Sequence, residues 1–309
     1  MIEKKKRVVI ALGGNAILKP GQKGTFDEQK ENIEISVDSF GAIIEAGYEL
    51  AIVHGNGPQV GQILQRNELC AQEIPAQPFS SASAQSQGYI GYMIQESIKS
   101  RYPDLDVATL LTMTEVDAAD PAFEKPTKPI GLFYSRAEAE KMEEEGFVMG
   151  EDAGRGYRRL VPSPQPQTIV ESNSVKKLLD TQTVVISCGG GGIPVVKKQG
   201  MYVGQDAVID KDAAALKLAE NIDADVLMIL TDVPNVFVNY GKENQTKLEE
   251  IKVAELEKFY KEGHFAAGSM GPKVKACIDF AQQGKQAIIS SLENGVAALE
   301  GKMGTRVTR

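Results

Sequence analysis

The chain has 309 residues, of which 42% are hydrophobic and 25% are charged, and its formal net charge is −8. This length is near the upper limit for one hydrophobic core, and the composition is ordinary for a globular protein. The negative charge argues against nucleic acid or an anionic membrane as a partner, and no apolar run approaches the roughly 18 residues of a membrane span. The three cysteines lie far apart, which favours free thiols and a cytoplasmic protein.

The first third of the chain alternates between predicted strands and amphipathic helices. Val8–Leu12 is continuously apolar, as is typical of a strand buried on both faces of a parallel sheet, and Tyr48–Val53 is predicted as the next strand. Between them, Thr25 and Glu28 form a capping box that begins a helix, and Gly47 ends it. Further along we expect a helix beginning at Pro58, a helix carrying Ile90, Met93, Ile94 and Ile98, and a strand at Val107–Met113.

Residues 120–171 interrupt this alternation. They contain six prolines, several glycines and a highly charged helix that starts at Ser135 with Glu138 as its capping partner. A polar helix between proline-rich connections indicates a segment inserted into the domain. It is either a lid over a site or a decoration of the surface.

The alternation resumes after residue 171. The predicted elements are a strand at Val184–Ser187, a hairpin around Lys197–Gly200, a helix at Lys211–Glu220, a strand at Val226–Leu230, helices near Val253–Glu262 and Pro272–Gln283, and a last strand at Gln286–Ile289. This order predicts one α/β domain over residues 1–309, with a mostly parallel sheet covered by helices on both faces. The lid is inserted into it at residues 120–171.

Three glycine-rich turns follow three of the predicted strands. They are Gly13-Gly14-Asn15, Gly55-Asn56-Gly57 and the run Gly189–Gly192, which includes Gly190 and Gly191. Turns of this kind between a strand and a helix let backbone N–H groups converge on an anion at the positive end of the helix dipole. Three of them, beside the two lysines described next, indicate a ligand with several phosphates.

Two lysines open two of the later helices, Lys211 after Asp210 and Lys273 after Pro272. A lysine in a first helical turn costs roughly 0.3–1 kcal/mol unless something negative lies beside it. Phosphoryl transfer needs positioning and positive charge at the transferred group, which these lysines could supply. Asp210 could orient Lys211, cap its helix, or do both, and Lys128 could reach down from the lid.

Several other classes of site are disfavoured. The sequence lacks a P-loop and a G-x-S-x-G elbow, and Gly55–Gly61 has one residue too many for a dinucleotide-binding fingerprint. His54 and His264 are the only histidines, which argues against a zinc site built on them. We interpret His54 as structural, at the end of a buried strand, and His264 as a packing residue at a helix end.

A series of motifs runs in order along most of the chain: Ala11–Ala16, His54–Gly61, Ser86–Tyr92, Pro126–Gly131, Val208–Asp212 and Glu262–Lys273. In these motifs the sequence resembles the amino acid kinase superfamily and, within it, the carbamate kinase family. The proline-flanked Lys128 and the run Gly268–Lys273 are the most specific to that family. The resemblance implies an α/β/α sandwich that dimerises. It also implies reversible, Mg²⁺-dependent phosphoryl transfer between ATP and carbamate, in arginine or related catabolism.

The resemblance further implies roles for individual residues. Carbamate and the moving phosphoryl group would be held by Gly13, Gly14, Asn15, Gly55, Asn56, Gly57, Gly190 and Gly191. Lys128, Lys211 and Lys273 would balance its charge, with Asp210 organising the lysines. Asp232, Tyr240, Met270 and Lys273 would line the nucleotide site. Mg²⁺ would be held mainly by the nucleotide phosphates, with no metal site assigned to the protein, and transfer would be direct and in line.

Two alternative functions stay open. A sister kinase that acts on a larger acid such as N-acetylglutamate would need an arginine or similar anchor for the second carboxylate, and none stands out near the first two glycine turns. A nucleotide sensor without catalytic activity would be expected to lose at least one phosphate lysine. Lys128, Lys211 and Lys273 are all present.

Overall fold

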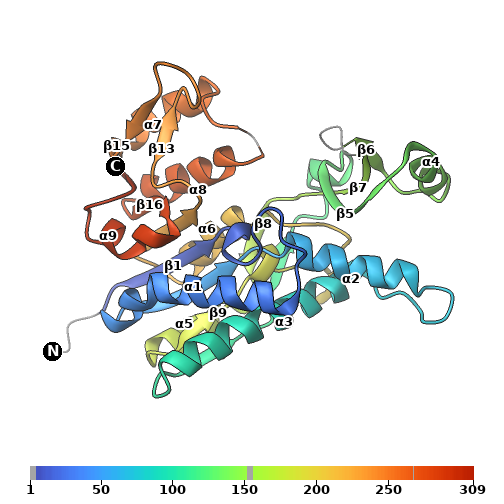
Figure 1. Ribbon diagram of the computed structural model, residues 1–309, viewed down its shortest axis with the longest axis horizontal. Helices are drawn as coiled ribbons and strands as arrows, with labels where there is room; N and C mark the ends of the chain where they lie inside the picture. Colours follow the sequence, from blue (N-terminus) through green and yellow to red (C-terminus); the bar gives the residue numbers. More distant parts are fainter. Residues whose placement is uncertain (1–4, 152–155, 267) are drawn as a thin grey trace.

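The computed structural model describes residues 5–151, 156–266 and 268–309, and its centre is an eight-stranded sheet (Figure 1). The strand order is β15-β17-β16-β12-β1-β2-β9-β3. All neighbours in this sheet are parallel except β16 and β17, which confirms the prediction of a mostly parallel sheet. The strands are β1 (Arg7–Leu12), β2 (Glu49–His54), β3 (Val107–Thr109), β9 (Val184–Ile186), β12 (Val226–Thr231), β15 (Glu250–Lys252), β16 (Gln286–Ser291) and β17 (Thr305–Thr308).

Helices cover both faces of this sheet, because its strands are apolar on both sides. In β1, Val8 and Ile10 pack into one core, and Val9 and Ala11 pack into the other. The first face is covered by α1 (Phe26–Glu45), α3 (Phe79–Arg101) and α9 (Gly295–Leu299). The second is covered by α5 (Ser172–Asp180), α6 (Lys211–Asn221), α7 (Val253–Lys261) and α8 (Met270–Gln282). The three-layer α/β/α sandwich is therefore confirmed.

The helix boundaries follow local signals in the sequence. Thr25 Oγ1 accepts from the backbone N–H of Glu28 at 3.3 Å, and the Glu28 carboxylate accepts from the backbone N–H of Thr25 at 3.0 Å, so the predicted capping box begins α1. Gly47, with φ of +72°, follows its end. The box predicted at Ser135 and Glu138 likewise begins α4 (Arg136–Glu144).

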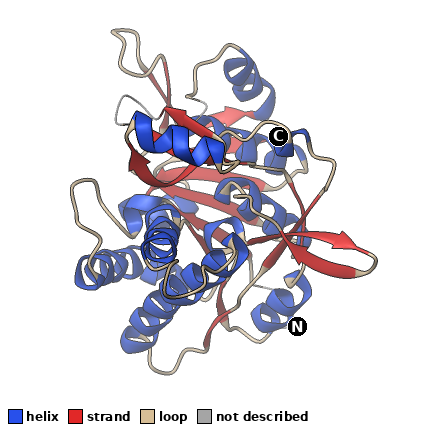
Figure 2. Cartoon of the chain, turned by 90° about the vertical axis from the view of Figure 1, so that its right-hand side faces the viewer, coloured by secondary structure: helices blue, strands red, loops and turns tan. Residues whose placement is uncertain are grey.

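Part of the inserted segment projects from the body at the right of Figure 1, and Figure 2 views the molecule from that side. This protruding subdomain consists of α4 and an antiparallel sheet of β5 (Lys128–Tyr134), β7 (Tyr157–Val161) and β6 (Met149–Glu151). It is shorter than the predicted range of residues 120–171. The short helical turn η2 (Pro121–Phe123) precedes it, and β8 (Pro166–Ile169) pairs with β4 (Met113–Val116) in a separate four-stranded sheet, β11-β10-β4-β8.

The remaining strands of that sheet, β10 (Ile193–Lys198) and β11 (Met201–Gly204), form the predicted hairpin. Two other predictions are wrong. The strand predicted at Val107–Met113 is interrupted, because the chain leaves the central sheet after β3 and enters the four-stranded sheet at β4. The strand at Gln286 is not the last, since β17 follows it. The short and partly polar strands β13 (Val236–Val238), β14 (Thr246–Leu248) and β15 also escaped prediction.

Candidate active site

The three glycine turns meet at the carboxyl ends of β1, β2 and β9, which are neighbours in the central sheet. A methyl group placed on Gly55 would lie 3.8 Å from the Gly14 Cα and 3.6 Å from the Lys211 Cδ. One placed on Gly190 would lie 2.0 Å from the Asn56 Nδ2. The first and second turns are thus in contact beside Lys211, and the third packs on the second so tightly that a side chain at Gly190 is excluded.

The backbone N–H of Gly13 is directed into the fold. It donates to the Leu230 carbonyl at 3.0 Å, so this group is already used within the fold. A methyl group at Gly13 would lie 3.2 Å from the same carbonyl oxygen, which is tighter than most real contacts. Gly13 therefore permits the close approach of the first turn to β12. Gly57 begins α2 (Gly57–Leu69), in which Pro58 is the second residue.

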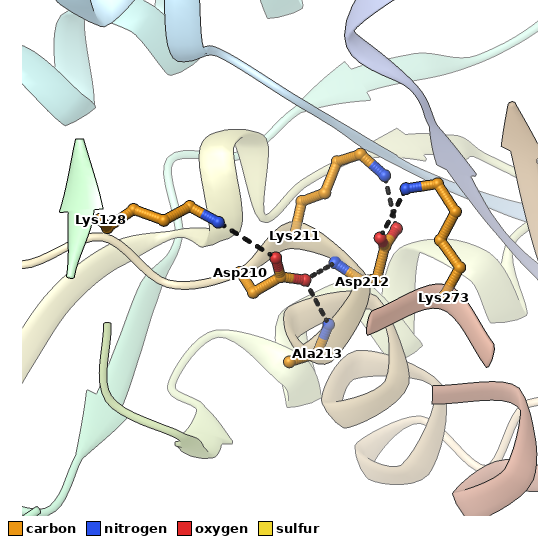
Figure 3. Close-up of polar contacts among 6 residues, drawn as sticks. All are labelled: Lys128, Asp210, Lys211, Asp212, Ala213 and Lys273. Carbon is orange, nitrogen blue, oxygen red and sulfur yellow. Dashed lines mark hydrogen bonds and ion pairs between the residues drawn. The ribbon is translucent and has the colours of Figure 1, made fainter. Parts of the chain in front are cut away.

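Lys211 and Lys273 share one carboxylate, that of Asp212 (Figure 3). Lys211 forms an ion pair with one oxygen of Asp212, and the Lys273 Nζ lies 3.0 Å from the other oxygen. The Asp212 side chain is only 3% exposed. Because two cations meet one anion, this buried cluster carries a net positive charge.

Burial lowers the pKa of Lys211, and the neighbouring Lys273 lowers it further, whereas the Asp212 carboxylate opposes both effects. For Asp212, burial acts to raise the pKa, but Lys211 and Lys273 outweigh it and hold the pKa below its usual value. The carboxylate is therefore ionised at neutral pH. It stabilises the charged form of Lys211 in an environment that would otherwise disfavour it.

Of the two roles left open for Asp210, the structure shows the helix cap, and among the described residues no hydrogen bond or ion pair joins its carboxylate to Lys211. One of its oxygens caps α6, accepting from the backbone N–H groups of Asp212 at 2.9 Å and Ala213 at 3.4 Å. The other lies 3.4 Å from the Nζ of Lys128, which comes from the protruding subdomain (Figure 3). The residue that organises Lys211 and Lys273 is Asp212. It was missed because an acidic residue in a first helical turn is commonplace, and only the packing of α6 against α8 shows its partners.

A cavity of about 610 Å³ lies beside this cluster, at the end of β12. Asp232, Tyr240 and Met270 line it, as do the rings of Phe237 and His264. The Phe237 and Tyr240 rings lie 6.1 Å apart at their centroids. Lys273 is not among the lining residues but lies on the same helix, α8, as Met270. A concave site with aromatic walls and a few polar groups can hold a flat heterocycle.

Asp232 also connects this cavity to the first glycine turn. The Asn15 Nδ2 donates to an Asp232 oxygen at 2.6 Å. The structure thus brings together the predicted phosphate, lysine and nucleotide residues at the carboxyl ends of the strands. Open parallel sheets bind their ligands at this end.

The surroundings of the histidines and cysteines indicate structural roles. The His54 Nδ1 lies 2.8 Å from the Gly55 carbonyl, which can only accept, so Nδ1 carries the proton. Burial lowers the pKa of His54 to about 4, and the ring is neutral at pH 7. His264 accepts from the Asn239 N–H at 3.4 Å and meets Phe259 edge-on. The three cysteines, Cys70, Cys188 and Cys277, are free. In the described part of the chain, no three His, Cys, Asp or Glu side chains are grouped so as to hold a metal.

Comparison with known proteins identifies the family. Residues 6–291 match the family described as "Amino acid kinase family", and the chain belongs to it. Within this family it is 53% identical to the carbamate kinase of Pyrococcus horikoshii, over 98% of this chain and 99% of the relative. It is 49% identical to the carbamate kinase of Clostridium perfringens, over 98% of this chain and the whole of the relative.

Solved structures agree with these sequences. Carbamate kinase from Giardia lamblia bound to AMP-PNP has a TM-score of 0.94 with this chain, at 47% identity and with 98% of both chains covered. These likenesses confirm the expected family, the carbamate kinases, and the expected fold. None of the helices in the described residues is long and apolar enough to cross a lipid bilayer.

Proposed function

We propose that the protein catalyses reversible phosphoryl transfer between carbamoyl phosphate and ADP, which yields carbamate and ATP. Relatives of about 50% identity that align over nearly their whole length are carbamate kinases, and one solved relative binds AMP-PNP. The observation that carries the proposal is the pair of lysines from two helices, held by Asp212 beside three converging glycine turns. Such a site can surround a transferred phosphoryl group with fixed positive charge.

The nucleotide would occupy the cavity lined by Asp232, Tyr240 and Met270. An oxygen of the ADP β-phosphate would then attack the phosphorus of carbamoyl phosphate, and the bond from phosphorus to the carbamate oxygen would break on the opposite side. Carbamate leaves as a carboxylate anion, so no external proton donor is required. Lys211 and Lys273 would stabilise the charge on the transferred oxygens, and backbone groups of the glycine turns would orient them.

Mg²⁺ would accompany the nucleotide and neutralise part of the phosphate charge. The carboxylates nearest the lysines are already engaged, Asp212 with Lys211 and Lys273, and Asp210 with Lys128 and the start of α6. This donor set does not offer a free cluster of acidic oxygens to a metal. We therefore assign the ion to the nucleotide phosphates rather than to a protein site.

The chain would function as one domain, with the protruding subdomain within residues 120–171 as a lid over the carbamate end of the site. Lys128 begins β5 and pairs with Asp210 at the start of α6, so it joins the protruding subdomain to the catalytic cluster. Closure of the lid would bring the Lys128 charge onto the acceptor and exclude water. The reaction would run in the cytoplasm towards ATP, in arginine or related catabolism.

A homodimer would form through the exposed edge of the central sheet. β3 is the last strand at this edge and packs against α3, since a methyl group on Gly91 would overlap the Thr109 side chain. Tyr92 of α3 and Leu111, two residues after the end of β3, are 58% and 54% exposed. An apolar sheet edge of this kind favours association with a second copy. Light scattering should give the dimer mass for the wild type and the monomer mass for Leu111→Lys, and a monomeric wild type would reject the dimer.

The proposed activity is tested by mixing the purified protein with ADP, Mg²⁺ and carbamoyl phosphate and measuring ATP. Acetyl phosphate and N-acetylglutamyl phosphate serve as alternative donors. We expect rapid ATP formation from carbamoyl phosphate alone. ATP from N-acetylglutamyl phosphate instead would indicate the sister kinase, and no ATP from any donor, in a protein that still binds ADP, would indicate a nucleotide sensor.

A further inference from the structure

Two adjacent residues of α3, Ser86 and Gln87, lie behind the glycine turns. They are 0% and 2% exposed and belong to a motif to which the sequence analysis assigned no role. Buried polar side chains in a helix need partners, because a buried group left without a hydrogen bond keeps the full cost of its desolvation. Both side chains have such partners, and these partners lie in or next to the second and third glycine turns.

Ser86 orients the amide of Asn56 in the second turn. The Ser86 hydroxyl donates to the Ser83 carbonyl at 2.7 Å, and the Asn56 Nδ2 lies 2.9 Å from the same hydroxyl oxygen. Since the Ser86 proton is directed to a carbonyl, the hydroxyl can only accept from Asn56. The NH₂ group of Asn56 must therefore face Ser86, which fixes the direction of its Oδ1.

Gln87 acts on the third turn through Thr112. Its Oε1 accepts from the Thr112 N–H at 2.9 Å, and its Nε2 donates to the Thr112 carbonyl at 3.1 Å. Both backbone groups of Thr112 thus bond to one side chain, at the point where the predicted strand is interrupted, and its carbonyl also accepts from the Ile193 N–H at 2.9 Å. The Thr112 hydroxyl in turn accepts from the Cys188 N–H at 2.7 Å.

The third turn needs this support because its backbone is unusual. Cys188 has a φ of +52°, a left-handed conformation that is unfavourable for a residue with a side chain. It leads directly into Gly189–Gly191. The far end of the turn is held by the Thr114 hydroxyl, which donates to the Gly191 carbonyl at 2.8 Å. Thr112 and Thr114 therefore fix the turn at both ends.

We infer that Ser86 and Gln87 are positioning residues, which set the second and third glycine turns at the distance that phosphoryl transfer requires. This inference rests on the proposed function. Both residues would act on the ligand indirectly, Ser86 through Asn56 and Gln87 through Thr112 and Cys188. Because both lie on one turn of α3, a single rigid element holds the two turns relative to each other.

The test uses Ser86→Ala and Thr112→Val, which each remove one hydroxyl with little change in volume. We expect kcat for ATP formation to fall about 10- to 100-fold in each, because a misplacement of the reacting groups by about 1 Å is enough for such losses. The KM for ADP should stay within about twofold, because other elements line the nucleotide cavity. Thr112→Ser keeps the hydroxyl and should restore most of kcat.

Ser97→Ala is the matched control. Ser97 is also buried on α3 and donates to the Met93 carbonyl at 2.8 Å, so it tests the loss of a serine hydroxyl away from the turns. It should keep the wild-type kcat. If both Ser86→Ala and Thr112→Val keep the wild-type kcat, whatever their Tm, this inference is overturned and the proposed function is not. A wild type that makes no ATP would reject the proposed function and this inference with it. If Ser86→Ala does not fold, the comparison of Thr112→Val with Thr112→Ser decides.

Discussion

The Nζ of Lys273 lies 3.0 Å from a carboxylate oxygen of Asp212, although the two residues belong to different helices. Lys273 is in the first turn of α8, and Asp212 is the second residue of α6. The other oxygen of Asp212 pairs with Lys211. The positive charge of the site is therefore placed by the packing of α6 against α8, two helices that share the core on one face of the sheet.

Removing Lys211 should abolish turnover and leave the fold intact. In Lys211→Ala we expect kcat to fall at least about 100-fold, as when a single stabilising donor is lost from a preorganised site. Asp212 keeps Lys273 as a partner, so Tm should change little. Lys217→Ala, which removes the partner of Glu220 on the same helix, is the control and should keep its activity. Normal activity in Lys211→Ala would reject its assigned role.

Asp212→Asn should make the enzyme more sensitive to alkaline pH. The Asp212 carboxylate raises the pKa of Lys211, while burial and Lys273 lower it. Without the carboxylate this pKa falls further, so Lys211 loses its proton at a lower pH than in the wild type. The alkaline limb of the profile of kcat/KM against pH should shift to lower pH. An unshifted limb, in a folded and active variant, would show that the charge of Lys211 does not depend on Asp212.

The role of Lys128 is separable from nucleotide binding. Lys128 contacts Asp210 from the protruding subdomain, whereas the nucleotide cavity is lined by other segments. Lys128→Ala should therefore lower kcat by more than it weakens the binding of ADP, which calorimetry can measure. Lys141→Ala, on α4 of the same subdomain, should leave both quantities unchanged. An unchanged kcat in Lys128→Ala would show that the protruding subdomain is a decoration of the surface and not a lid.

Gly190→Ala should inactivate the protein. Gly190 has a φ of +64°, and an added methyl group would lie 2.0 Å from the Asn56 Nδ2, so Asn56 must move. Gly284→Ala separates this clash from backbone strain, because Gly284 has a φ of +78° but no atom within 4 Å of an added methyl group. The control should lose only about 1–2 kcal/mol of stability and keep its kcat. Equal kcat in the two variants would contradict the close packing of the turns.

Arg7 should matter for stability rather than for activity. It is buried at the start of β1, where its Nε donates to Glu49 at 2.8 Å and its Nη1 to the Ile222 carbonyl at 2.7 Å. Arg7→Ala leaves Glu49 buried without this partner, so the free energy of unfolding should fall by about 3–5 kcal/mol. The more exposed pair Lys285–Asp223 provides the control, and Lys285→Ala should cost less than about 1 kcal/mol. Denaturant unfolding measures both, and equal losses would contradict the prediction.

Much of the fold could be predicted because its signals are local. The capping boxes at Thr25 and Ser135 connect residues three apart, so any helix that begins there shows them in the sequence. The apolar run of β1 and the glycine turns that follow the strands are equally local. The repeated order of strand, turn and helix also explains why the sandwich was predictable, and two of the family motifs, Ala11–Ala16 and His54–Gly61, contain these turns.

The partners of the site residues could not be predicted in the same way. Which of Asp210 and Asp212 meets Lys211 depends on the direction of each side chain at the start of α6, and its second partner, Lys273 of α8, lies 61 residues further along the chain. The N–H of Gly13 is used by β12, and the N–H of Thr112, between β3 and β4, is used by a side chain from α3. These contacts join segments that are distant in the sequence. Hydrogen bonds and ion pairs depend on separations of a few ångströms in space, which the spacing of residues along the chain does not reveal. Local chemistry in the sequence therefore specifies the turns and lysines, and the packing of helices on the sheet specifies how they meet.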